Sequence, residues 1–281
     1  SFASQSFVQW FRARGGSPET TRGPVLLFAD TFTNYNHPEL GRSAVAVLEA
    51  LGYEVVVPDF KCCGRPQLSA GDADRARRNA GANVEIAAQA LALQEVETGE
   101  PGVYMVGLEP SCILMFRDEY LDLLPGDETA KAVADRTVLV DEFLSRALAE
   151  EGPWPFDGAE GKLLFHGHCQ QKAIVGTEHS MKVLRSLPNS EVEEIDSGCC
   201  GMAGSFGFEK EHYDVSMDIG NLALFPAIRA QSGDFEVVSL GVSCRHQIAD
   251  GTGRKALHLV EVMAGAITRP ATHVEPLAHE L

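Results

Sequence analysis

Short runs of apolar residues alternate along this chain with longer segments of helical periodicity. The apolar runs predict strands over residues 25–29, 53–57, 103–108, 163–166, 192–195 and 236–240. The periodic segments predict helices over 38–51, 72–93, 178–187, 210–229 and 254–267, and short helices that fill 113–123 and 128–149. Strands that alternate with helices build parallel sheets through right-handed crossovers. The predicted fold class is therefore α/β, with small parallel sheets flanked by helices.

The order of predicted elements occurs twice. Cys62-Cys63-Gly64 follows the second strand of the first half, and Cys199-Cys200-Gly201 follows the corresponding strand of the second half, at an offset of 199 − 62 = 137 residues. Leu108–Cys112 matches Leu240–Cys244 at an offset of 244 − 112 = 132 residues. Self-similarity of this kind indicates duplication. We therefore expect two pseudo-symmetric lobes, each containing one cysteine-cysteine-glycine repeat.

Turn residues and polar stretches suggest where the lobes begin and end. The segment Gly152–Gly158 contains two glycines and two prolines and is the expected lobe boundary. The predicted organisation is an N-terminal entry and linker (1–23), a first lobe (24–152), a second lobe (159–268) and a loosely ordered tail (269–281).

Composition and charge narrow the class of protein. The chain has 281 residues, is 44% hydrophobic and has a net charge of −17, with a pI of about 4.9. Such an acidic chain lacks the basic surface on which nucleic-acid binding depends, and we expect no nucleic-acid partner. It has no apolar run long enough to predict a transmembrane segment. The chain does not begin with Met, which fits either a processed or a cropped piece of a longer chain.

The cysteines point to a reducing compartment and to metal chemistry. No secretory signal pattern opens the chain, and its seven cysteines are an odd number, which disfavours a disulfide framework. We expect a cytoplasmic protein, with any membrane attachment supplied by a partner. Adjacent cysteines rarely form a disulfide with each other. Glycine-rich turns can nevertheless direct two neighbouring thiolates towards one inorganic centre.

The second half contains enough cysteines for a complete metal site. Cys169, Cys199, Cys200 and Cys244 all follow predicted strands, whose carboxyl ends meet at one edge of a parallel sheet. Four cysteines suit either a cubane iron–sulfur cluster or zinc. The gaps of 199 − 169 = 30 and 244 − 200 = 44 residues match neither ferredoxin nor zinc-finger spacing, so spacing leaves the metal open. The first half offers Cys62, Cys63 and Cys112.

Other polar and aromatic residues near these cysteines have two interpretations each. They either contact a ligand or tune the centre, or they cap helices, pair on the surface and pack. The candidates are His166, His168, His246, Asp30, Asn34, Tyr35, His37, Glu109, Arg65 and Arg245, together with Phe206 and Phe208, which are expected to pack over the second cysteine loop.

Four segments carry a resemblance to a known family: 30–39, 107–112, 165–169 and 196–209. With the duplicated Cys-Cys-Gly pattern, they resemble the cysteine-rich CCG domain of heterodisulfide reductase and of the iron–sulfur subunits of glycolate oxidase and anaerobic glycerol-3-phosphate dehydrogenase. The similarity is greatest to the C-terminal portion of flavin-linked D-2-hydroxyacid dehydrogenases, which act on D-2-hydroxyglutarate or D-lactate. The resemblance covers roughly 24–266. It implies a 4Fe–4S cluster ligated by Cys169, Cys199, Cys200 and Cys244, and a second cluster if Cys62, Cys63 and Cys112 also hold one.

The sequence departs from the family pattern at three positions. Thr31 stands where the first half would have its opening cysteine. Glu109 and Gly241 replace the first cysteine of the closing Cys-x-x-Cys in the two halves. A hydroxyl is a poor iron ligand beside thiolates, so we expect unequal halves, with the cluster in the second.

The function implied by the resemblance is an iron–sulfur electron-transfer module of a flavin-dependent 2-hydroxyacid dehydrogenase. FAD is expected only on a partner or a domain outside this chain, since no Gly-x-Gly-x-x-Gly follows a strand here. The expected partners are a flavin-bearing dehydrogenase domain or subunit and a ferredoxin-like domain. Two alternatives stay open: a heterodisulfide reductase-like thiol–disulfide oxidoreductase and a structural zinc protein. The sequence assigns no catalytic residue.

Overall fold

The computed structural model describes residues 2–15, 20–99, 102–149, 154–157 and 161–268. These residues form two four-stranded parallel sheets, in the strand orders β2-β1-β3-β4 and β6-β5-β7-β8. The strands are β1 (Arg22–Phe28), β2 (Tyr53–Val56), β3 (Met105–Gly107), β4 (Thr137–Leu139), β5 (Gly161–Phe165), β6 (Ser190–Glu194), β7 (Phe235–Val238) and β8 (Ala256–Leu257).

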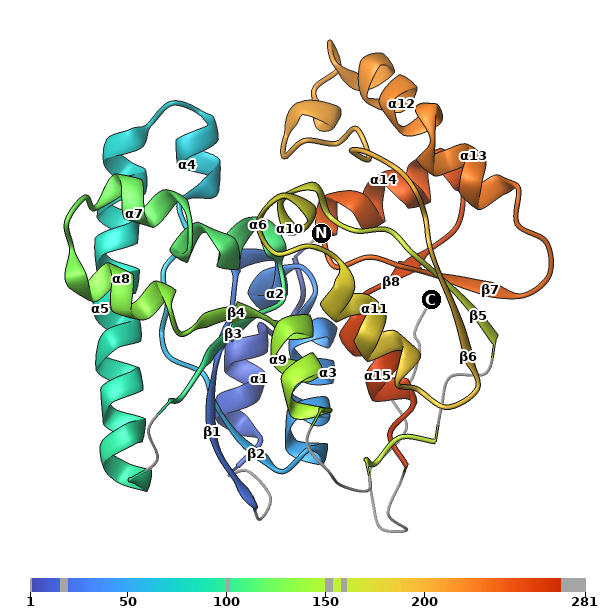
Figure 1. The fold of residues 1–281 in the computed structure, drawn as a ribbon. Helices are drawn as coiled ribbons and strands as arrows, with labels where there is room; N and C mark the ends of the chain where they lie inside the picture. The colour runs from blue at the N-terminus through green and yellow to red at the C-terminus, as the bar shows by residue number, and fades with distance from the viewer. Residues whose placement is uncertain (1, 16–19, 100–101, 150–153, 158–160, 269–281) are drawn as a thin grey trace.

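Helices flank both sheets (Figure 1). Those of the first half are α1 (Phe7–Ala13), α2 (Thr31–Tyr35), α3 (Pro38–Ala50), α4 (Arg65–Ser69), α5 (Ala73–Thr98), α6 (Pro110–Ile113), the 3₁₀ helix η1 (Leu114–Phe116), α7 (Glu119–Leu123), α8 (Glu128–Ala134) and α9 (Val140–Ala147). Those of the second half are α10 (Cys169–Ile174), α11 (Glu178–Arg185), the 3₁₀ helix η2 (Phe206–Phe208), α12 (Tyr213–Leu222), α13 (Leu224–Arg229), α14 (Val242–Thr252) and α15 (Leu259–Gly265).

The two sheets have the same topology, which confirms the predicted α/β duplication. The first strand of each half lies between the second and third strands, so the strand order reverses beside β1 in one sheet and beside β5 in the other. In open parallel sheets, ligands bind at such switch points, outside the carboxyl ends of the strands. Both halves therefore offer a binding edge in the same place.

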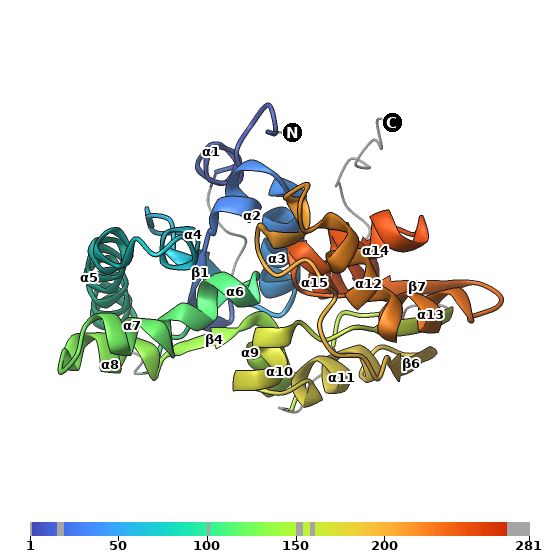
Figure 2. The ribbon, with the colours of Figure 1, turned by 90° about the horizontal axis from the view of Figure 1, so that it is seen from above.

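Four helices join the halves in two matching pairs. Helix α3 of the first half packs against α15 of the second, and α9 packs against α11. Because α3 and α11 hold equivalent places in the two halves, as do α9 and α15, the pairs are related by a pseudo-twofold axis. Figure 2 shows all four between the sheets. Leu48 of α3 and Met263 of α15 are fully buried in one apolar core that runs through both halves.

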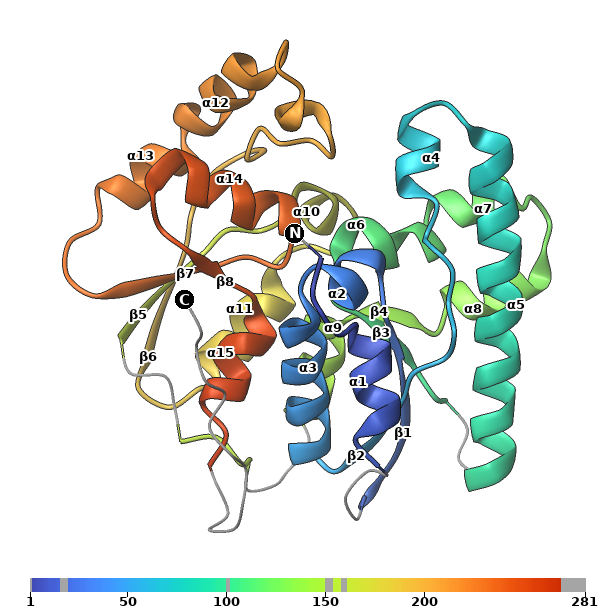
Figure 3. The same cartoon turned by 180° about the vertical axis from the view of Figure 1, so that it is seen from behind.

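A smaller apolar core supports the cysteines of the second half. Phe225 of α13 and Ile248 of α14 are fully buried in it, and Cys200 and Cys244 belong to the same cluster. The cysteine edge of this half therefore rests on packed side chains. The long helix α5 and helix α13 lie on opposite outer sides of the molecule (Figure 3). No helix in the described part of the chain is both long and apolar enough to cross a membrane.

Local chemistry explains why α5 is longer than predicted. Asp72 caps its beginning, since its carboxylate accepts a hydrogen bond from the backbone N–H of Arg75. The helix continues past the predicted end at residue 93 and stops at Gly99, which has φ of 71°. Glycine adopts this left-handed conformation without the penalty that a side chain brings, so it ends helices well.

Three predicted helical segments differ from the structure. The short helices predicted over 128–149 are present as α8 and α9, but strand β4 lies between them, and the helix predicted over 254–267 contains strand β8 before α15 begins. Both strands are two or three residues long, too short to show a period of their own. The helix predicted over 210–229 is divided at Ala223, where φ and ψ are −147° and −47°. The whole predicted tail (269–281), and residues 152, 153 and 158 of the predicted hinge, lie outside the described residues.

Candidate metal centre

All seven cysteines lie just beyond the carboxyl ends of strands. In the first half, Cys62 and Cys63 follow β2, and Cys112 lies on α6, which follows β3. The second half repeats this arrangement with the pair after β6 and one cysteine on α14 after β7, and it adds Cys169 as the first residue of α10 after β5. The cysteines therefore gather at the switch point of each sheet, as the sequence predicted.

The second-half cysteines form a continuous series of thiol contacts. Cys199 interacts through its side chain with both Cys169 and Cys200, and Cys200 also interacts with Cys244. Hydrogen bonding to Cys169 and then to Cys200 lowers the pKa of Cys199 well below that of a free thiol. Exposure falls along the series: Cys169 is exposed, Cys199 is half-buried, and Cys200 and Cys244 are 4% and 2% exposed. One end of the series is therefore open to solvent.

The first half has the same arrangement with one thiol fewer. Cys63 interacts with both Cys62 and Cys112. Thr31 is the first residue of α2, as Cys169 is of α10, and its side chain hydrogen bonds Cys62. Thr31 thus lies against the pair as Cys169 does in the second half. The predicted equivalence of Thr31 and Cys169 is confirmed in position, and three thiols remain here against four in the second half.

The three candidate histidines have different environments. His166 is fully buried, and its Nδ1 lies 2.9 Å from Ser197 Oγ. His168 caps α10, because its Nδ1 accepts a hydrogen bond from Gln170 N at 3.2 Å. His246 lies between the halves, with its ring centroid 5.6 Å from that of His37. The capping interpretation therefore applies to His168, while His166 faces the thiols.

Glu109 connects the two cysteine-bearing edges, which the sequence did not predict. One oxygen, Oε1, accepts hydrogen bonds from Ser111 N and Oγ at the start of α6. The other, Oε2, accepts from Val242 N at 2.7 Å, at the start of α14. The capping role foreseen for this carboxylate is confirmed, and it extends to a helix of the other half.

Gly241 leaves space that its neighbour needs. A Cβ atom at this position would collide with the imidazole ring of His168. The cysteine that the family pattern places here would therefore displace the ring that caps α10. Glycine at 241 therefore lets His168 keep its capping position beside Cys244.

The candidates after β1 mostly have structural roles. Asp30 accepts hydrogen bonds from the backbone of Phe32 and Thr33 and from the Thr33 hydroxyl, so it caps α2. Burial raises its pKa to about 6, against the lowering effect of the Thr33 hydroxyl. Asn34 accepts from Val8 N and so holds α1 in place.

The remaining candidates lie around the edges of the two sites. Tyr35 is exposed, and His37 pairs with Glu39 at 3.0 Å. Phe206 stacks on His212 with centroids 4.2 Å apart. Phe208 is 63% exposed, so the prediction that it packs over the cysteine loop is wrong for this residue.

The two arginines stabilise local structure beside the cysteines. Arg65 donates to Ser111 O and pairs with Glu119. Arg245 is buried and donates to the carbonyls of Ser239 and Leu240. Desolvation lowers the pKa of Arg245 from its usual value. Both side chains therefore bring positive charge close to a cysteine group, as their sequence positions suggested, while also holding backbone in place.

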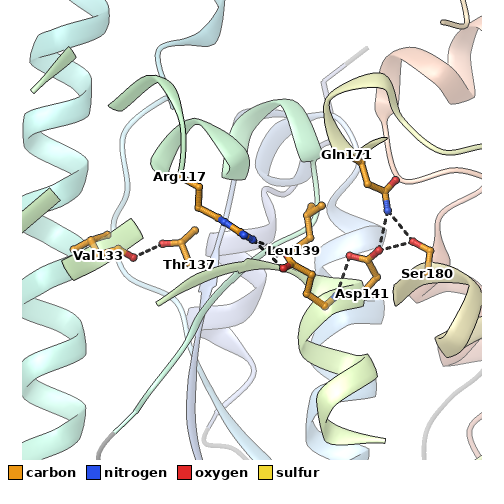
Figure 4. A network of polar contacts seen from close by, with 8 residues as sticks. Arg117, Val133, Thr137, Leu139, Asp141, Gln171 and Ser180 are labelled. Atoms are coloured by element: carbon orange, nitrogen blue, oxygen red, sulfur yellow. Dashed lines mark hydrogen bonds and ion pairs between the residues drawn. The ribbon is translucent and has the colours of Figure 1, made fainter. Parts of the chain in front are cut away.

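A buried polar network holds the exposed cysteine helix from the other half. Asp141 of α9 accepts hydrogen bonds from Gln171 Nε2 at 2.8 Å and from Ser180 Oγ (Figure 4). Gln171 lies on α10, and its Oε1 accepts in turn from His168 N at the start of that helix. The first half therefore fixes the turn of helix that carries Cys169.

This network predicts a pH-dependent difference in stability between the protein and Asp141→Asn. Burial raises the pKa of Asp141 in the folded protein to about 6, from an ordinary value of 3.8. At a pH between these two values, the Asp141 carboxyl is protonated in the folded state and ionised in the unfolded state. Stability from this group is then present at low pH and falls as pH rises. We expect the wild-type unfolding free energy to fall relative to the variant by about 2 kcal/mol between about pH 4.5 and pH 7. Urea unfolding of both proteins in metal-free form checks this, and a pH-independent difference would contradict it.

The donor chemistry of the second half fits a thiophilic metal centre. Four thiols meet there, and the imidazole of His166 is beside the buried pair: a ring nitrogen of His166 and the Sγ atoms of Cys200 and Cys244 lie within 4.8 Å of one another. His166 Nε2 is buried without a hydrogen-bond partner among the described residues. Sulfur-rich donor sets favour zinc and iron–sulfur clusters. An unsatisfied polar atom beside buried thiols is costly unless something occupies the site.

Fold and site together define a duplicated α/β protein with a cysteine-lined binding edge in each half. The model of the cysteine-rich domain family, CCG, matches residues 28–117 and 163–249. The chain belongs to this family, and the resemblance inferred from the sequence is confirmed.

Several curated proteins are similar over most of the chain. One subunit of the anaerobic glycerol-3-phosphate dehydrogenase of Escherichia coli K12 is 32% identical over 93% of this chain, which spans 64% of that subunit's length. D-2-hydroxyglutarate dehydrogenase of Pantoea ananatis is 30% identical over 87% of the chain and 23% of its own length. Lactate utilization protein A 2 of Bacillus cereus Q1 is 26% identical over 87% of the chain and 99% of its own length. The family therefore includes subunits and portions of dehydrogenases.

One solved structure has the same fold. The crystal structure of a hypothetical protein from Helicobacter pylori superposes with a TM-score of 0.52 at 14% identity, over 94% of this chain and 53% of that one. At this level of identity, the likeness concerns the fold alone.

Proposed function

We propose that this chain is an iron–sulfur electron-transfer module of a flavin-dependent 2-hydroxyacid dehydrogenase. The observation that carries the proposal is the series of four contacting thiols, Cys169, Cys199, Cys200 and Cys244, at the switch point of the second sheet. A 4Fe–4S cluster held there would supply one-electron transfer. The chain's own residues would bind it, exclude water from its inner side and leave the Cys169 side open towards a donor or acceptor.

The similarity to dehydrogenase subunits and portions supports the oxidoreductase part of this proposal. FAD then resides on a partner subunit or on another domain, and a ferredoxin-like domain is a candidate neighbour in the electron path. Attachment to a membrane, where it occurs, would come from such a partner. Structural zinc at the same four thiols is the competing outcome, and metal analysis separates the two.

The isolated chain should not oxidise D-lactate or D-2-hydroxyglutarate with an artificial dye as acceptor, because substrate oxidation requires a flavin site. It should instead accept electrons from photoreduced flavin, with bleaching of its visible absorbance, and pass them to the dye. Anaerobic spectrophotometry measures both reactions, and the Cys200→Ser variant is the matched control for the second. Robust turnover of either acid by this chain, with no flavoprotein added, would refute the module proposal.

A further inference from the structure

His166 occupies a position in the second half that has no equivalent donor in the first. The opening residues of α2 and α10, Thr31 and Cys169, are equivalent, and counting back three residues from each leads to Phe28 and His166. Phe28 is fully buried and packs edge-on against Phe60 and Phe116, with centroids 4.9 Å and 5.3 Å away. The half that lacks the opening cysteine thus also has an apolar ring in place of the imidazole.

A backbone hydrogen bond fixes the position of His166 at the carboxyl end of β5. Its N–H donates to Val238 O at 2.9 Å, which extends the β5–β7 pairing by one residue beyond β5. The side chain therefore leaves the sheet at its carboxyl edge, beside the strand that leads to Cys244. The residue is fully buried, and one of its ring nitrogens lies within 4.8 Å of Cys244 Sγ.

The hydrogen bonds of Ser197 indicate which ring nitrogen is free. The Ser197 hydroxyl lies 3.4 Å from Ile195 O, to which it can only donate, and 2.9 Å from His166 Nδ1. The 2.9 Å contact occupies Nδ1 whichever of the two groups donates, so Nε2 is the ring nitrogen left over. Nε2 is buried and has no hydrogen-bond partner among the described residues. As a metal ligand, Nε2 would supply the lone pair and Nδ1 would carry the proton. Metal-bound histidines usually donate their other ring N–H in this manner.

We propose that His166 Nε2 is a metal ligand of the second-half centre, together with the buried thiols of Cys200 and Cys244. With Cys199, these residues make a complete set of four donors. Cys169, which is the exposed thiol of the series, then becomes the ligand that can dissociate and be exchanged. The identity of the metal as iron rests on the proposed function, whereas the nitrogen donor is expected for whichever metal binds.

Direct spectroscopy of the anaerobically purified wild-type protein tests the ligand. X-ray absorption at the edge of the bound metal should show a nitrogen donor at about 2.0–2.1 Å beside sulfur at about 2.3 Å. If iron is bound, pulsed EPR of the reduced protein should show a strongly coupled nitrogen that changes when histidine is labelled with ¹⁵N. An all-sulfur shell, or only the weak coupling of a hydrogen-bonded nitrogen, would overturn the proposal.

Variants give a second, independent readout. His166→Ala should weaken metal binding more than about tenfold, whereas Cys169→Ser should retain most of the metal and keep the nitrogen signal. His246→Ala is the matched control, since that ring contacts His37 and Phe208 and should leave the nitrogen signal unchanged. Greater metal loss in Cys169→Ser than in His166→Ala would contradict the proposal.

The outcome also separates this inference from the proposed function. Zinc with a nitrogen donor would refute the iron–sulfur function and support His166 as a ligand. An iron centre bound by sulfur alone would support the function and refute His166 as a ligand.

Discussion

Cys200→Ser should lose most of its bound iron and its visible absorbance. Cys200 is 4% exposed, interacts with both Cys199 and Cys244, and lies beside His166, so it occupies the middle of the buried donor set. A serine hydroxyl is a poor replacement for a soft thiolate ligand. Iron assay and absorbance spectra of protein purified anaerobically measure the loss.

Cys63→Ser is the matched control for this prediction. Cys63 is equally buried, at 2% exposure, and occupies the equivalent position in the first half. With Thr31 in place of a fourth thiol, we expect the first half to bind little iron, so the control should lose much less and mainly affect packing. Equal iron loss in the two variants would defeat the idea of unequal halves and would indicate one centre shared between them.

Glu109→Ala should destabilise the protein by about 3 kcal/mol, because it leaves the donors at the start of two helices, one of them the buried Val242 N–H, without an acceptor. The affected donors are Ser111 N and Oγ on α6 and Val242 N on α14. The change also removes the carboxylate whose charge favours the buried guanidinium of Arg245. Since α14 carries Cys244, metal content of the second half should fall as well. Chemical denaturation followed by circular dichroism, together with metal assay, measures both effects.

Glu109→Gln is the matched control, because it removes the charge of the side chain and keeps one oxygen that accepts hydrogen bonds. Its amide oxygen can still accept from one helix, so we expect a loss roughly half as large as that of the alanine variant. A loss of stability below about 1 kcal/mol in Glu109→Ala would show that the hydrogen bonds of Glu109 to α6 and α14 do not hold the halves together.

The general position of the site could be predicted from sequence because it follows from strand order. Parallel strands bring their carboxyl ends to one edge, so cysteines that each follow a strand must gather there. The duplicated Cys-Cys-Gly motifs then predicted a second edge of the same kind. Thr31 could be matched to Cys169 in the same way, because each stands a few residues after the first strand of its half.

Contacts between the halves could not be predicted in this way. Glu109 and Val242 are separated by 133 residues, and their hydrogen bond depends on how α3 and α9 pack against α15 and α11. The role of His166 likewise depends on which ring nitrogen faces Ser197, a matter of rotamer and register. Strand β4 is three residues long and buried throughout, so it has no alternation by which to recognise it.

Metal and sulfide content per chain tests the central claim most directly. The protein should be purified without oxygen and assayed for iron, acid-labile sulfide and zinc, and its absorbance spectrum should be recorded. One cluster in the second half predicts about four irons and about four sulfides per chain, with broad absorbance at about 400 nm and little zinc. A colourless protein with stoichiometric zinc and no labile sulfide would contradict the account.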